Sequence, residues 1–390
     1  MRVVRRVCVG VVLAVVSACA TMSSVSTESR QSNHQETFKS NLSQIKKAAA
    51  EGDISAQFKL GSMFLLGHGV LQDYAQAREW LEKASAQGDP KAQVNLGLIY
   101  ENGLGVEQDY VRARELYKMA ANQGNEAAAS NLGGMYYFGE GVVQDYEQAF
   151  KWYEKAAHNE FAEAQQILAS MYENGHGVTK DLTQAHQWYE KAAEQGHPVA
   201  QYKLSLMYHS GDGVPKNDVL AFKWIEKSAN QGYAPAQYGL GVRYSQGSVV
   251  LRDHVLARQW YEKAANQGHL LALYNMAQKH LKGEGGPKDT VTASQLFEKA
   301  ARQGLPDAQY NLGVMYEEGI GVRQSYEQAR QWYEKAALQG DALADFNLGV
   351  MYESGKGVRK DPSKGKEYFG KACDLGLQIG CDAYRRLNEK

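Results

Sequence analysis

Two tetrapeptides of this chain have the Ser-x-x-Lys spacing, in which a lysine amine can act as the base for a serine nucleophile. They occupy residues 43–46 and residues 363–366. Two matches in a chain of 390 residues are near what chance gives, and neither has the accompanying motifs of penicillin-reactive enzymes. The sequence therefore lacks a complete site for serine acylation.

Metal, phosphate and nucleic-acid sites are missing from the sequence as well. The ten histidines are scattered and His-Glu-x-x-His does not occur, so no ligand cluster is evident. Recurring glycine pairs follow no predicted strand and lack the context of a phosphate-binding loop. The formal net charge of -1 does not favour nucleic acid as a partner. We expect no enzyme activity, no cofactor, no metal and no nucleic-acid partner.

The glycine pairs mark a period of 36 residues that fills residues 53–376. Gly67 and Gly69 form the first pair, and eight further copies follow, one of which has Gly247 but Val249. A fixed period of this length indicates stacked helix pairs rather than one globular core. We predict an all-α fold, a right-handed α-solenoid of nine 36-residue helix–turn–helix repeats.

One repeat, residues 89–124, shows how the helices are specified. Apolar residues at helical spacing predict a first helix, helix A, over residues 91–102, which Gly103 ends. Asp109 is expected to cap the second helix, helix B, which stops at Gly124. The helix A slot of Ala92 holds Ala in all nine copies, which indicates close helix packing. All six tryptophans share one helix B slot, and we expect them in the core.

The recurring Leu-Gly, Met-Tyr, Gly-x-Gly-Val and Trp-Tyr-Glu-Lys-Ala-Ala segments resemble the Sel1-like repeat, a relative of the tetratricopeptide repeat. Residues 131–136 and 311–316 are good copies, and the resemblance covers residues 53–376. It implies a non-enzymatic adaptor that binds a partner protein or peptide. Cysteine-rich relatives have been linked with penicillin binding and β-lactamase activity. A β-lactam- or peptidoglycan-binding or hydrolysing envelope protein is therefore the alternative.

Several copies between about residues 160 and 285 depart from the repeat pattern. Leu-Gly becomes Leu-Ala, Leu-Ser or Met-Ala, and Met-Tyr becomes Arg243-Tyr244 and Lys279-His280. Glu160 and Val249 replace expected glycines. Two interpretations stay open, namely drift in a tolerant middle region, or altered superhelical curvature where a partner docks.

Residues 1–18 have the layout of a bacterial signal peptide, with arginines, an apolar stretch from Val7 to Val16 and small residues before Cys19. This ending resembles a lipobox, which implies that Cys19 carries lipid. Residues 19–40 are polar and predict a flexible tether. Ala20, rather than Asp, follows Cys19, and this resembles an outer-membrane address rather than inner-membrane retention. We therefore expect an exported protein that is lipid-anchored to the outer membrane, facing the periplasm or the cell surface.

Cys373 and Cys381 are the cysteines that remain after the signal peptide and the lipid site are set aside. The turn around Gly376 can bring them together, and a lone pair in an exported protein predicts a disulfide. Their spacing also resembles that of the cysteine-rich branch of Sel1-like proteins. We expect capping helices within residues 41–52 and 377–390, on either side of the repeats.

The partner site is expected on the inner, concave surface, which A helices line in stacked helix pairs. One A-helix slot repeatedly holds asparagine, and its neighbour is often aromatic. Asparagine amides can bind the backbone of an extended peptide while tyrosine rings supply apolar contact. In the alternative, asparagine forms a ladder between repeats and tyrosine fills the interface. The candidate residues are Asn95, Asn131, Asn275, Asn311, Asn347, Tyr274 and Tyr310.

Overall fold

A computed structural model describes residues 41–389 of the chain. The predicted signal peptide, Cys19 and the tether lie outside these residues. Across residues 41–389, no helix is both long and apolar enough to cross a bilayer. The chain divides into two compact units, the first ending at Ala192 and the second beginning at Ala193.

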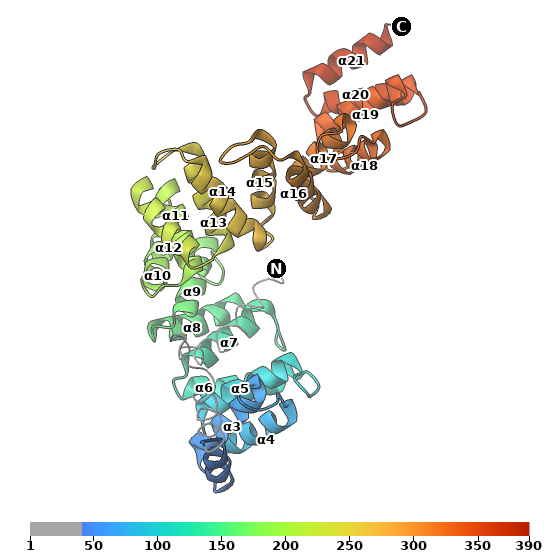
Figure 1. Cartoon of the computed structure of the whole chain (residues 1–390). Coiled ribbons are helices and arrows are strands. Elements are labelled where there is room, and N and C mark those ends of the chain that lie inside the picture. The colour runs from blue at the N-terminus through green and yellow to red at the C-terminus, as the bar shows by residue number, and fades with distance from the viewer. Residues whose placement is uncertain (1–40, 390) are drawn as a thin grey trace, which may run out of the picture. The chain divides into compact units, whose positions relative to one another are not determined.

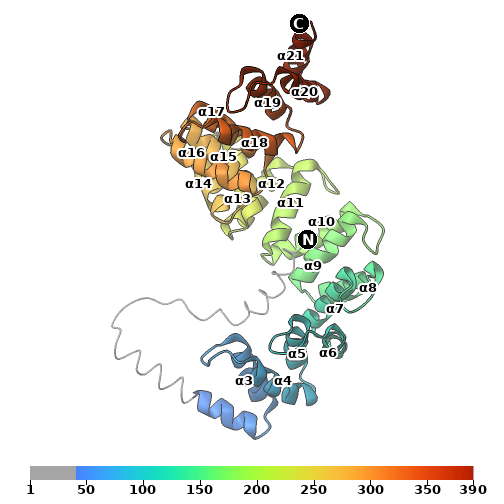
Figure 2. The same cartoon turned by 90° about the vertical axis from the view of Figure 1, so that its right-hand side faces the viewer.

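The first unit is a series of helix pairs, and α3 and α4 lie side by side in both views of the chain (Figures 1 and 2). Residues 41–50 are helical, within the range where a capping helix is expected. The helices that follow are α3 (Ile54–Leu66), α4 (Tyr74–Ala86), α5 (Pro90–Asn102), α6 (Tyr110–Asn122), α7 (Glu126–Phe138), α8 (Tyr146–His158), α9 (Ala162–Asn174) and α10 (Leu182–Glu194).

The second unit continues the same alternation, and α21 packs against α20 at its end. Residues 41–389 contain helices and no β-strand, so the predicted all-α solenoid is confirmed. The helices of this unit are α11 (Pro198–Ser210), α12 (Asp218–Asn230), α13 (Ala234–Gln246), α14 (His254–Asn266), α15 (Leu270–Lys282), α16 (Thr290–Arg302), α17 (Pro306–Glu318), α18 (Tyr326–Ala337), α19 (Ala342–Ser354), α20 (Pro362–Asp374) and α21 (Gln378–Asn388).

The helix boundaries follow from capping residues, as α5 and α6 illustrate. The Asp89 carboxylate accepts a hydrogen bond from the Ala92 N–H at 2.6 Å and begins α5. Gly103 ends α5 with a φ of 63°, a left-handed conformation that costs glycine little. Asp109 then accepts from the Arg112 N–H at 2.9 Å and begins α6, as its position in the repeat predicted.

The glycine of the recurring Leu-Gly segment makes room for an aromatic side chain from helix B. A Cβ atom added to Gly97 would lie 2.5 Å from a ring carbon of Tyr117. Tyr117 is fully buried in this position, and the invariant alanine of the same repeat, Ala92, is buried as well. Close packing of this kind explains why these two A-helix slots hold such small residues.

The six tryptophans are only partly in the core, so their expected burial is confirmed for two of them. Trp188 and Trp332 are buried, whereas the other four are half-buried. In every case the lysine three residues later places its ammonium over the indole ring, for example Lys263 at 3.8 Å from the centroid of Trp260. The same arrangement recurs over Trp80, Trp152, Trp188, Trp224 and Trp332. These tryptophans bury one face against the repeat while a cation covers the other.

One helix junction carries backbone strain. Glu160 has a φ of 62° and is the one non-glycine residue with a positive φ among residues 41–389. Glycine occupies the corresponding position in the neighbouring repeats, for example Gly124 and Gly196. An L-residue in this conformation brings Cβ close to the following carbonyl oxygen, which costs roughly 1–2 kcal/mol.

A disulfide closes the C-terminal end of the second unit, as predicted. Cys373 in α20 is bonded to Cys381 in α21. The bridge joins the last helix B of the repeats to the helix that packs on it. α21 lies within residues 377–390, where a capping helix is expected.

Candidate partner-binding site

The predicted asparagines lie on the A helices, and the amides of Asn95 and Asn311 hydrogen-bond within the protein. Asn95 in α5 is 7% exposed and donates a hydrogen bond to the Ser62 hydroxyl of the preceding repeat at 3.1 Å. Asn131 occupies the same slot of α7 and is half-buried. In the first unit, then, Asn95 makes a contact between repeats and presents little surface to a partner.

The asparagines of the second unit reach back to tyrosines of the preceding repeat. Asn311 donates to the Tyr274 hydroxyl at 3.4 Å and to the Asp307 carbonyl at 2.7 Å. Asn275 lies near enough to Tyr238 to oppose the rise that burial causes in its pKa. Asn347 acts on the pKa of Tyr310 in the same way. This is the geometry that the ladder between repeats requires, and peptide binding by the same residues stays a prediction.

The two predicted tyrosines are half-buried beside helix B aromatics. The Tyr274 ring lies 5.5 Å from that of Phe297, edge to face, and Tyr310 lies 5.8 Å from Tyr333. Such pairs hold the rings in place. Each ring therefore contacts its own repeat and keeps part of its surface exposed, so both roles weighed for these tyrosines are physically compatible.

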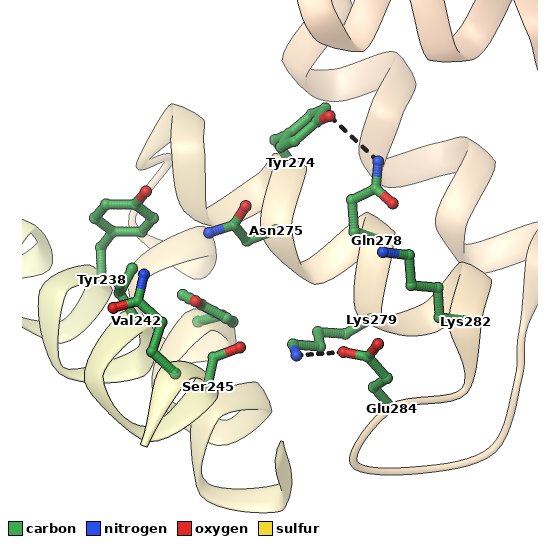
Figure 3. A pocket seen from close by; sticks show the side chains of 11 residues that line it. Tyr238, Val242, Ser245, Tyr274, Asn275, Gln278, Lys279, Lys282 and Glu284 are labelled. Carbon is green, nitrogen blue, oxygen red and sulfur yellow. Dashed lines mark hydrogen bonds and ion pairs between the residues drawn. The ribbon is translucent and has the colours of Figure 1, made fainter. Parts of the chain in front are cut away.

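A pocket of about 510 Å³ lies among α13, α14 and α15 (Figure 3). Two of the predicted residues, Tyr274 and Asn275, line it, and the other five do not. In Figure 3, Asn275 points toward Tyr238 across the pocket, while Gln278 donates to the Tyr274 hydroxyl at 3.2 Å. The full lining is Tyr238, Val242, Ser245, Gln246, Tyr261, Tyr274, Asn275, Gln278, Lys279, Lys282 and Glu284.

Burial keeps two tyrosine hydroxyls of the pocket, those of Tyr238 and Tyr261, protonated at neutral pH. Burial raises the pKa of Tyr261 to about 12, and it also raises the pKa of Tyr238. The Asn275 amide lies near both hydroxyls and opposes part of this rise. This side of the pocket therefore offers neutral hydrogen-bonding groups and aromatic surface.

A lysine occupies a core position on the opposite side of the pocket. Lys279 stands in the A-helix slot that holds buried methionine in other repeats, such as Met207 and Met315. Its ammonium pairs with the Glu284 carboxylate at 2.5 Å and lies 3.0 Å from Nδ1 of His254. The hydrogen bond from Lys279 is the main reason why the pKa of Glu284 lies below its ordinary value. Glu284 therefore stays ionised beside the buried ammonium.

The neighbouring departures from the repeat pattern also have polar partners. Arg243, in the same slot one repeat earlier, donates to the Ser205 hydroxyl at 3.3 Å, and both residues are buried. His280, in the tyrosine slot, is buried with the Arg258 guanidinium 3.1 Å from its ring nitrogens. Burial and this cation lower the pKa of His280. The compensation is incomplete, because the buried Nε of Arg243 and Nη1 of Arg258 have no hydrogen-bond partner within residues 41–389.

Sequence reasoning missed Lys279 and Glu284 as site residues. The exchange of Met-Tyr for Lys279-His280 was visible, but it was interpreted as drift or altered curvature. A cation that replaces a buried methionine is itself a signal, because charged groups are buried only with partners. Among residues 41–389 there is no group of His, Cys, Asp and Glu that could hold a metal ion.

The helix pairs around this pocket match a known family. Residues 54–377 match the family model described as Sel1 repeat in nine consecutive copies. The chain belongs to the Sel1 repeat family. The copies span residues 54–89, 90–125, 126–160, 162–197, 198–233, 234–269, 270–305, 306–341 and 342–377. Sel1 repeat proteins generally mediate protein–protein interactions, and their solenoids are typically scaffolds rather than enzymes.

Solved structures of Sel1 repeat proteins resemble this chain over most of its length. A Sel1 repeat protein from Oxalobacter formigenes is 32% identical, with a TM-score of 0.60 over 87% of this chain and 99% of its own. A protective antigen of uropathogenic Escherichia coli strains, described as displaying an SLR fold, is also 32% identical. Its TM-score is 0.56, over 88% of this chain and 82% of its own. No curated protein gives a match to this sequence.

Proposed function

We propose that this Sel1 repeat protein is a non-enzymatic adaptor that binds an extended segment of a partner protein along its A helices. The observation that carries the proposal is the pocket of α13–α15. It combines half-buried tyrosine surface with amide groups and a buried cation. A pocket with a few convergent polar groups is a typical binding site. A site of this composition suits a side chain of a protein partner.

The Asn–Tyr contacts support the proposal by fixing the geometry of the neighbouring surface. The Asn311 amide holds Tyr274 in place through a hydrogen bond. A preformed surface loses less side-chain freedom on binding, and this favours affinity. Under the proposal the same residues stabilise the stacking of repeats and present tyrosine edges to the partner.

We place the protein in the bacterial envelope, tethered through lipid on Cys19 and the polar segment 19–40. The apolar stretch before Cys19 and the small residues around it support this location. The relative described as a protective antigen supports an exported location too, because the immune system must encounter such a protein. The tether leaves the repeats free to reach a partner near the membrane.

Photo-crosslinking tests the adaptor function with the full chain in solubilised envelope. A crosslinking amino acid at Gln246, an exposed residue of the pocket lining, should capture a discrete protein. The matched control carries the same amino acid at the exposed Glu327 in α18. The captured protein is then purified and its direct binding measured by calorimetry. Equal or empty capture from both positions would contradict the proposal and direct the work to peptidoglycan and β-lactam binding.

A further inference from the structure

The buried ammonium of Lys279 has more hydrogen-bond donors than it has partners within residues 41–389. The Lys279 side chain is only 8% exposed, yet its residue lines the pocket. An ammonium group has three donors. Glu284 and His254 account for two of them. Within residues 41–389 the third donor has no partner, so it can bind a group that enters the pocket.

The charges of the lining favour an anionic guest. Lys279 and Lys282 are its two cations, and Glu284 is its one acidic side chain, which leaves a net charge of +1. Lys282 lies three residues after Lys279 in α15 and is exposed, so its ammonium stands at the rim. Figure 3 shows the two lysines on the same side of the pocket. A monoanion would neutralise this pocket, whereas a doubly charged phosphate would leave it with a net charge of -1.

The position of Glu284 makes it an internal counterion rather than part of the core. It follows Gly283, the residue that ends α15, and its side chain is 36% exposed. Lys279, by contrast, is held within the helix. Glu284 thus keeps the buried ammonium paired while the pocket is empty. It also lowers the attraction of the pocket for a guest anion, because like charges repel.

We propose that this pocket receives a carboxylate side chain, aspartate or glutamate, of the partner's extended segment, bound between Lys279 and Lys282. This proposal rests on the proposed adaptor function and adds the chemistry of the partner. The tyrosine edges of Tyr238 and Tyr274 contact the aliphatic part of the guest residue. The Asn275 and Gln278 amides lie within the same lining and face its backbone.

Fluorescence anisotropy of the full chain with rhodamine-labelled hexaglutamate tests the proposal, with hexaglutamine as the uncharged comparison. Wild-type protein should bind hexaglutamate and not hexaglutamine. Lys279→Met restores the residue of other repeats, so it should fold normally while weakening hexaglutamate binding about tenfold, the loss expected for a hydrogen bond to a charged group. Lys282→Gln should weaken binding as well. Glu284→Gln should strengthen it severalfold because a competing charge is removed.

The control variant is Lys299→Met, which removes an exposed lysine of α16 outside the pocket. It should bind hexaglutamate like wild type. Equal affinity of Lys279→Met and Lys299→Met, or no binding of hexaglutamate by wild type, would overturn the proposal. Displacement of hexaglutamate by inorganic phosphate at lower concentration than by acetate would overturn the choice of a carboxylate.

The same variants separate this inference from the adaptor function. The Lys279→Met protein can carry the same crosslinking amino acid at Gln246. If it captures the partner as efficiently as the wild-type protein does, the adaptor function stands and the carboxylate assignment fails. If hexaglutamate binding depends on Lys279 but no protein is captured, the anion site stands and the adaptor function fails.

Discussion

The side-chain amide of Gln339 donates a hydrogen bond to the side-chain oxygen of Gln309 at 2.8 Å. Gln309 is buried in α17 and in turn donates to the Ala301 carbonyl at the end of α16. The pair therefore joins both helices of one repeat to the preceding repeat. The same arrangement recurs with Gln201 and Gln231, and with Gln237 and Gln267.

Replacing Gln309 should therefore weaken the contact between repeats. Gln309→Leu leaves the Ala301 carbonyl and the Gln339 amide without this partner, and an unsatisfied buried polar group costs about 1–3 kcal/mol. We expect the free energy of unfolding in urea to fall by that amount. Gln303→Leu is the control, because Gln303 occupies the slot of Gln339 one repeat earlier, where the slot of Gln309 holds Leu273. Equal losses in both variants would show that the Gln309 bonds are not responsible.

The last repeat has aspartate in the slot of Gln309. Asp345 is 3% exposed, and burial raises its pKa. A carboxyl whose folded-state pKa is raised binds its proton more tightly when folded. Its favourable contribution is thus complete below the ordinary carboxyl pKa and is lost as the pH rises through the raised value.

Asp345→Gln should accordingly stabilise the protein at pH 7, by about 1 kcal/mol. The gain should shrink when the pH falls below the ordinary carboxyl pKa, because wild-type Asp345 is then protonated. Thermal unfolding of both proteins at pH 3.5 and pH 7 measures this difference. A gain in Tm that is the same at both pH values would contradict the assignment to Asp345 ionisation.

The strained junction at Glu160 gives a third prediction. Glu160→Gly should stabilise the protein by about 1 kcal/mol, since glycine adopts the positive φ without the Cβ clash but also gains freedom in the unfolded chain. Asn159→Gly is the control at the adjacent exposed residue, whose φ of -88° suits any residue. It should be neutral or destabilising in the same urea unfolding measurement. A destabilised Glu160→Gly variant would mean that the Glu160 side chain makes a stabilising contact that outweighs the strain.

The proposed lipid anchor predicts a clear labelling result. Cys19→Ala should abolish incorporation of radiolabelled palmitate and release the protein from the membrane fraction. Cys373→Ala should keep both the label and the membrane location. Retention of palmitate in Cys19→Ala would exclude this cysteine as the lipid site.

The fold was predictable because its determinants are local and repeated. The N-cap at Asp109 and the left-handed glycine at Gly103 act within a few residues, so a single repeat suffices to place α5 and α6. The disulfide between Cys373 and Cys381 was predictable for the same reason, since both cysteines flank one turn. The buried glutamines and the second glutamines 30 residues later recur with the same period. This pattern was visible in the sequence, but no hydrogen bond was predicted from it.

The arrangement of the candidate site residues could not be predicted because it depends on contacts between repeats. Asn311 contacts Tyr274 from 37 residues away, and only the stacking geometry decides that the amide meets the hydroxyl. Likewise, a lysine in a methionine slot can extend to solvent along its aliphatic stem. At Lys279 it stays buried because Glu284, on the following loop, supplies the counterion.

The two ends of the helix array differ in how their terminal helix is held to the neighbouring helices. The last helix pair is covalently joined, whereas the helix over residues 41–50 is held by side-chain packing around Ala49 and Leu60. An array whose units contact mainly their neighbours comes apart from its weaker end. A protease or a pulling force should therefore remove repeats in order from the N-terminal side. The disulfide therefore makes the N-terminal repeats unfold first, and the proposed tether attaches to that end.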